Sequence, residues 1–135
     1  IELLGQISVT LYAATTAKDT DFTARFCVVD KSGQSVNLQE GILRLRYRES
    51  LSDPKPAVQG EIYELRIELG PVGARVPGGS RLRLDISSSD FPQWDRNLNT
   101  GGTPLQESVL DAVPATQTVL HDQDRPTRVT LPVRR

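Results

Sequence analysis

Residues 81–101 read RLRLDISSSDFPQWDRNLNTG, and the chain changes character within this stretch. Up to residue 86 every second residue is apolar, which is the pattern of a half-buried β-strand. Beyond it turn-forming residues take over: Pro92 fixes the backbone φ angle, Asn97 can bond its own backbone, and Gly101 tolerates a positive φ. The stretch therefore predicts a strand that leads into an ordered loop.

This loop concentrates unusual side chains, including the only tryptophan of the chain, Trp94. We expect one of its two aromatic rings to lie in the domain and the other to lie against a neighbouring domain. Lining a substrate cleft and stacking on a free sugar ligand are the alternatives. The residues that we expect at this interface or cleft are Asp90, Phe91, Trp94, Asp95, Arg96 and Asn97.

The same alternation recurs through the rest of the chain, with turn-forming residues between the alternating segments. The further predicted strands are residues 6–15, 22–29, 35–38, 42–50, 61–69, 116–122 and 127–133. Gly41 is expected to separate two of these strands, residues 71–80 to form a turn, and residues 103–114 leave room for one short helical turn. Seven or eight short strands, with no amphipathic helix among them, predict an all-β fold, a two-sheet antiparallel β-sandwich.

Two of the predicted strands carry charge on their outward faces. In residues 42–50 the outward positions are Arg44, Arg46 and Arg48, and in residues 61–69 they are Glu, Arg and Glu. If these two segments pair antiparallel, opposite charges interleave. We interpret the arginine stripe as a solvated sheet face.

Composition bounds the class of protein. The chain has 135 residues, enough for one domain with a real core. Sixteen basic and 17 acidic side chains give a net charge of -1, so neither nucleic acid nor an anionic membrane is an expected partner. The single cysteine, Cys27, excludes an internal disulfide. Since the chain contains no methionine and starts inside an alternating pattern, we expect it to be a piece of a longer polypeptide.

The sequence shows no machinery for nucleophilic hydrolysis. No serine stands in the G-x-S-x-G pattern that exposes a nucleophile above an α/β sheet. The only histidine, His121, is followed by Asp122. Because a triad also needs an activated serine, we interpret His121 as a residue at the end of a strand that bonds backbone or the neighbouring turn, and we assign no catalytic residue.

Metal and cofactor sites are also not predicted. Asp95, Asn97 and Asn99 have the alternate spacing of a calcium loop. However, Thr100 stands where that loop requires glycine and Gln106 where it requires glutamate, so we interpret the three as turn-bracing residues. No Cys/His cluster indicates zinc, and no glycine-rich loop followed by lysine indicates phosphate binding.

Four separated motifs bear a family resemblance. They are SSSDFPQWDRNLNTG at 87–101, DTDFTA at 19–24, NL with GILR and RYR across 37–48, and ATQTVLHD with RPT and LPV across 115–133. In this order they resemble the C-terminal domain of the CocE/NonD family of serine hydrolases, the cocaine esterase and X-Pro dipeptidyl-peptidase group. Gln93 departs from the family, which commonly carries a basic residue there, so we expect no salt bridge from that position.

The resemblance implies a jelly-roll strand order, like that of galactose-binding domains, over a single domain at residues 1–135. It also implies a parent α/β-hydrolase with a Ser-His-Asp triad upstream, acting on esters or amides. The chain would be its non-catalytic accessory domain, packed on the catalytic domain and helping to shape the cleft. The alternatives are a free-standing module that binds carbohydrate and a purely structural or oligomerisation domain.

Overall fold

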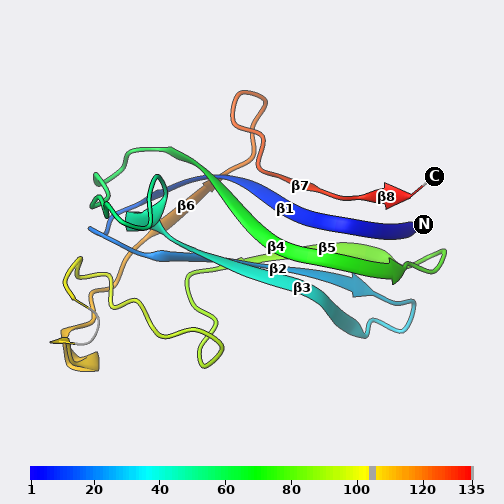
Figure 1. Ribbon diagram of the computed structural model, residues 1–135, viewed down its shortest axis with the longest axis horizontal. Helices are drawn as coiled ribbons and strands as arrows, with labels where there is room; N and C mark the ends of the chain where they lie inside the picture. The colour runs from blue at the N-terminus through cyan, green and yellow to red at the C-terminus, as the bar shows by residue number, and fades with distance from the viewer. Residues whose placement is uncertain (104–105, 135) are drawn as a thin grey trace.

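A computed structural model describes residues 1–103 and 106–134, which form two antiparallel sheets packed face to face (Figure 1). The first sheet contains β4 (Tyr63–Arg75), β1 (Glu2–Thr15) and β6 (Gln117–Leu120), and β7 (Arg128–Thr130) and β8 (Val133–Arg134) also pair with β1. The second sheet contains β3 (Ser35–Arg44), β2 (Asp21–Val29) and β5 (Arg81–Ser87). The described residues also include the 3-10 turns η1 (Leu45–Tyr47) and η3 (Val109–Asp111). Within the described residues no helix is long and apolar enough to cross a membrane.

The chain passes repeatedly from one sheet to the other. After β1 in the first sheet it forms β2 and β3 in the second, returns for β4, crosses for β5 and returns for β6 to β8. The predicted all-β sandwich is therefore confirmed. The alternation between sheets is the jelly-roll type of connection that the family resemblance implied.

The core lies between the two sheets and follows the predicted alternation. The inward side chains of β1, β2 and β4 are almost completely buried and include Ile7, Val9, Leu11, Phe22, Phe26, Leu65 and Ile67. Burial of each such side chain contributes about 1.5 to 3 kcal/mol relative to its exposure. Cys27 is also buried, as expected of a packed residue.

One edge of the sandwich is closed where β3 meets β4, although the two strands belong to different sheets. A Cβ atom at Gly41 would lie 2.2 Å from the carbonyl oxygen of Glu68, so only glycine allows this approach. Residues 42–50 and 61–69 do not pair as neighbouring strands, which was the condition for interleaving their charges, because the two segments pack across the core edge. Gly41 also does not divide two strands: β3 runs through it and ends at Arg44.

A second prediction that fails is the turn beginning at residue 71. β4 continues through Pro71 to Arg75, because the first residues of β1, from Glu2 to Gln6, pair with this part of β4. A register shift between Ile7 and Ser8 accommodates the change. The short helical turn allowed by residues 103–114 forms as η3.

The connection between β6 and β7 projects away from both sheets (Figure 1). β6 pairs with Tyr12–Thr15 of β1 and β7 pairs with Ser8–Thr10, so both strands are held by the same neighbour at separate places. The projection is closed by a bridge between His121 and Pro126. Within it, Asp122 Oδ1 accepts the backbone N–H groups of Asp124 and Arg125. This connection is thus a self-contained hairpin-like loop, which we call the excursion.

Candidate functional site

Two buried carboxylates stand at the start of β2, on the outer face of the second sheet. Asp19 and Asp21 are 0% and 1% exposed. Asp19 Oδ2 accepts from Arg46 Nε at 2.6 Å, and Asp19 Oδ1 accepts the Arg46 backbone N–H at 2.9 Å. Asp21 accepts two bonds from Arg44, at 2.8 and 3.0 Å. Arg44 thus binds Asp21 with two nitrogens of its guanidinium group, whereas Arg46 binds Asp19 with one guanidinium nitrogen and its backbone N–H. Both buried charges are paired and hydrogen-bonded, which compensates their burial.

The arginine stripe is consequently not a solvated face, and that interpretation is wrong. The side chains of Arg44, Arg46 and Arg48 are only 17%, 14% and 12% exposed. Arg48 lies over the ring of Tyr63, 4.5 Å from its centroid, and donates to the carbonyl oxygen of Lys55. Loops that come later in the chain cover the outward positions of this segment.

The residue that joins the loop to the two ion pairs is Asn97. Its Nδ2 donates to Asp19 Oδ2 and to Asp21 Oδ1, both at 2.8 Å. Its Oδ1 accepts the backbone N–H of Asn99 at 3.0 Å, which is the predicted turn-bracing bond. One amide group thus ties both buried carboxylates to the backbone of the loop.

Further bonds fix the remainder of the loop. Arg46 Nη1 donates to the Gly102 carbonyl at 2.9 Å, and Arg44 Nη2 donates to Asp95 Oδ1 at 3.2 Å. The hydrogen bond that Arg44 donates to Asp21 raises the pKa of Arg44 above its ordinary value despite burial, so this guanidinium stays charged. At the other end of the loop, Asp90 accepts from Arg25 at 2.7 Å. The loop is held over the outer face of the second sheet from both ends.

The tip of the loop faces outward. Phe91 is 52% exposed, and the guanidinium of Arg96 lies over its ring at 3.7 Å from the centroid. Trp94 is partly buried and donates its backbone N–H to the carbonyl of Asp90. Of the six predicted site residues, Asp90, Asp95 and Asn97 thus anchor the loop. The other three form its tip, and their contact with another domain stays a prediction.

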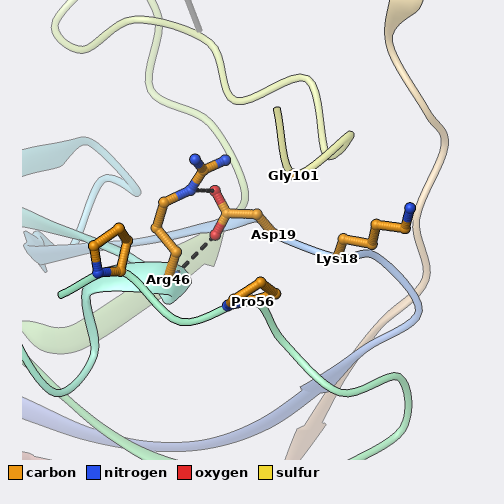
Figure 2. A pocket seen from close by; sticks show the side chains of 6 residues that line it. Lys18, Asp19, Arg46, Pro56 and Gly101 are labelled. Atoms are coloured by element: carbon orange, nitrogen blue, oxygen red, sulfur yellow. Dashed lines mark hydrogen bonds and ion pairs between the residues drawn. The ribbon is translucent and has the colours of Figure 1, made fainter. Parts of the chain in front are cut away.

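A small pocket opens beside the anchoring ion pair (Figure 2). It has a volume of about 150 Å³ and is lined by Lys18, Asp19, Arg46, Pro54, Pro56 and Gly101. Asp19 and Arg46 face each other in it, so their charges are engaged in their own pair. Gly101 has a positive φ of 79° and passes so close to Lys18 that a Cβ would lie 2.9 Å from the lysine Cβ. The close passage of the loop over the sheet therefore requires glycine here.

The described residues contain no cluster suited to a metal: among positions 1–103 and 106–134, no three His, Cys, Asp or Glu side chains converge. His121 is exposed at the end of β6, next to the excursion. Asp19 and Asp21, which carry the anchoring, were not among the predicted site residues. The signal was present as two aspartates two positions apart and two arginines two positions apart, which antiparallel pairing of Asp21 with Arg44 brings together.

Comparison with known proteins identifies the family of this chain. The family described as the X-Pro dipeptidyl-peptidase C-terminal non-catalytic domain matches residues 1–130. The chain belongs to this family. The resemblance drawn from the four motifs is therefore confirmed, and the absence of an elbow serine fits a domain that the family describes as non-catalytic.

Relatives of this X-Pro dipeptidyl-peptidase C-terminal domain include a cocaine esterase of Rhodococcus sp. (strain MB1 Bresler), 36% identical over 133 residues and covering 98% of the chain. Among solved structures, an α-amino acid ester hydrolase matches with a TM-score of 0.92 at 29% identity over 98% of the chain. An aminopeptidase from a marine sediment Thaumarchaeota archaeon matches with a TM-score of 0.88 at 29% identity over 96% of the chain. The chain spans 23% of the length of each of these three proteins.

Proposed function

We propose that this domain is the accessory part of a longer α/β-hydrolase that acts on esters or amides. It packs on the catalytic domain through residues 90–97, which we name the docking loop, and there helps to shape the mouth of the active-site cleft. The printed names of the relatives, an esterase, an ester hydrolase and an aminopeptidase, support the reaction class. Their greater length supports a catalytic domain on the same polypeptide.

The observation that carries the proposal is the contrast between the two sides of the docking loop. Its inner side is fixed by Asn97 on two buried carboxylates, whereas Phe91 at the tip is half exposed. A loop held in one conformation loses little conformational entropy when it binds. Phenylalanine and arginine are also enriched at protein interfaces. A preorganised aromatic tip is therefore suited to a permanent contact.

The test uses the parent polypeptide with Phe91→Ser, and Val36→Ser as the matched control. Val36 is 51% exposed and lies on β3 at the end of the sandwich away from the docking loop. In the isolated chain, both variants change the free energy of unfolding by less than about 0.5 kcal/mol, as surface substitutions do. In the parent, we expect only Phe91→Ser to uncouple unfolding of the two domains and to raise KM. Parent enzymes that behave identically with either variant would overturn the proposal.

A second measurement addresses the alternative of a free-standing carbohydrate module. The isolated chain is assayed for hydrolysis of a p-nitrophenyl acyl ester, for labelling by an active-site serine probe and for glycan binding. We expect no turnover, labelling or binding. Saturable glycan binding that disappears in Trp94→Ala would replace the accessory role, and ester turnover would show catalysis within the chain.

A further inference from the structure

A second apolar element lies at the same end of the molecule as the docking loop. The 3-10 turn η3 places Leu110 almost entirely in solvent, with 94% of its surface exposed, and leaves Val109 64% exposed. Val113, two residues beyond the turn, is 46% exposed. Figure 1 shows this turn at the same end of the molecule as the docking loop, beyond the end of the second sheet. We name residues 108–113 the apolar ledge.

The ledge is held in place by its own hydrogen bonds. Ser108 Oγ accepts the Leu110 backbone N–H at 3.2 Å, and Asp111 Oδ2 accepts the Ser108 backbone N–H at 2.7 Å. This reciprocal pair is a capping box, which fixes the start of a helical turn. Leu110 is therefore displayed on a defined turn and not on a free tail.

The ledge is also bonded to the segment that directly follows the docking loop. The Val113 N–H donates to the Leu98 carbonyl at 2.9 Å, and Asn99 Nδ2 donates to the Val113 carbonyl at 2.9 Å. Asn99 has a φ of 64°, in the left-handed region that asparagine adopts more readily than most residues other than glycine. The buried carboxylates position Asn97, Asn97 braces Asn99, and Asn99 holds the ledge. The two exposed elements are thus parts of one braced surface.

The chemistry of the ledge indicates which kind of partner binds it. Singly scattered exposed apolar residues need no explanation, but two on one braced turn, with a third two residues beyond it, give an apolar group that binding would bury. The only charge on the ledge, Asp111, is engaged in the capping box, so the ledge offers a sugar few polar groups and an anionic membrane no cation. More than three quarters of each relative lies outside the region matched by this chain.

We propose that the apolar ledge is a second contact with the catalytic domain, in which Leu110 inserts into an apolar pocket of that domain. This inference rests on the proposed function and adds to it a surface outside the docking loop. The partner surface is expected to be apolar at the Leu110 site. It is also expected to be continuous with the surface that receives Phe91.

Cysteine labelling tests the ledge separately from the loop. Leu110→Cys, Phe91→Cys and Leu4→Cys are made in the isolated chain and in the parent polypeptide, and a thiol reagent is followed by peptide mass spectrometry. Leu4, 61% exposed at the opposite end of the sandwich, is the control. All three should react rapidly in the isolated chain. In the parent, positions 110 and 91 should react at least about tenfold more slowly, because reaction then requires opening of the interface.

Each outcome has a distinct meaning. Protection of position 91 without position 110 overturns the ledge and leaves the proposed function standing. Free reaction at both positions in the parent overturns both. Protection of position 110 that grows with the concentration of the isolated chain assigns the ledge to self-association, and vesicle binding by the isolated chain that Leu110→Gln abolishes assigns it to a lipid surface. Either result overturns the inference.

Discussion

Arg44 and Arg66 have the same place in the sequence pattern and very different surroundings. Each lies at an outward position next to a strand-forming apolar residue, and each pairs with a carboxylate. The side chain of Arg44 is 17% exposed and that of its partner Asp21 is 2% exposed. For Arg66 and Glu68 the values are 73% and 56%. The difference comes from the docking loop, which covers the outer face of the second sheet where β2 begins and β3 ends, through Asp95 and Asn97.

The comparison shows that an ion pair determines local structure when it is covered and not when it is exposed. In water an ion pair gains little, because the solvent screens it and the side chains lose freedom. Under a loop, a carboxylate without its partner would be a buried uncompensated charge. Asp19 and Asp21, with their arginine partners, form what we call the buried row. This row therefore determines the position of the loop, whereas the exposed pairs determine no such position.

The largest effect is expected from Asp19→Ala. The substitution leaves Arg46 and the Asn97 amide without their acceptor under the loop, and removal of one partner from a buried pair costs about 3 to 5 kcal/mol. The free energy of unfolding, measured with urea, checks this value. Asp85→Ala, which removes the partner of the half-exposed Arg83, is the control and should cost less than about 1 kcal/mol. Equal losses of unfolding free energy in the two variants would contradict the distinction between the buried row and the exposed pairs.

A smaller effect is expected from Asn97→Ala. The substitution removes one amide group, and both carboxylates keep their arginine partners, so the net loss should be about 1.5 to 3 kcal/mol, the contribution of a hydrogen bond to a charged group. Asn37 is exposed and its Nδ2 donates to Glu40, so Asn37→Ala provides the matched control. We also expect faster proteolysis within residues 90–101 for Asn97→Ala alone. A loop that stays as resistant as in the wild-type chain would show that Asn97 does not position it.

The exposed turn at Asp30 sharpens the comparison through pH. The Ser32 hydroxyl and then the Gln34 N–H lower the pKa of Asp30 below its ordinary value of 3.8. A depressed folded-state pKa stabilises the fold above the unfolded value, and this stabilisation is lost as pH falls through the folded value. The stability difference between wild type and Asp30→Asn should therefore be present at neutral pH and vanish in acid below 3.8. Urea titrations across that range measure it, and a difference that persists in acid would contradict the sign.

The smallest effect is expected at Arg66 and Glu68. A double-mutant cycle with alanine at both positions should give a coupling free energy of about 0.5 kcal/mol or less, decreasing with added salt. The four proteins are compared by urea unfolding at low and high salt. A coupling above about 1 kcal/mol would place this exposed pair in the class of the buried row.

The fold was largely readable from the sequence, because alternation reports which side chains of a strand face the core. The core residues Ile7, Leu11 and Ile67 lie where the pattern placed them. Alternation does not report what covers the other face. Arg44 and Arg46 were interpreted as solvated because the covering residues stand about 50 positions later in the chain.

The loop itself was predictable, and its anchorage was not. Turn chemistry at Asn97 and Gly101 signalled an ordered loop, and both residues have the predicted roles in the backbone. The carboxylates that Asn97 reaches, Asp19 and Asp21, are more than 70 residues earlier, so no local pattern joins them. The closed edge at Gly41 was missed for the same reason, since its constraint comes from a carbonyl in another sheet.

The excursion between β6 and β7 gives the domain a place to accept foreign sequence. Both flanking strands are registered independently on β1, and the tip at Gln123 and Asp124 is exposed. A peptide tag or fluorescent reporter inserted between these two residues would leave the strand registers and the docking loop unchanged. The domain can thus be made visible, or joined to another protein, at a point remote from the surface through which we propose that it docks.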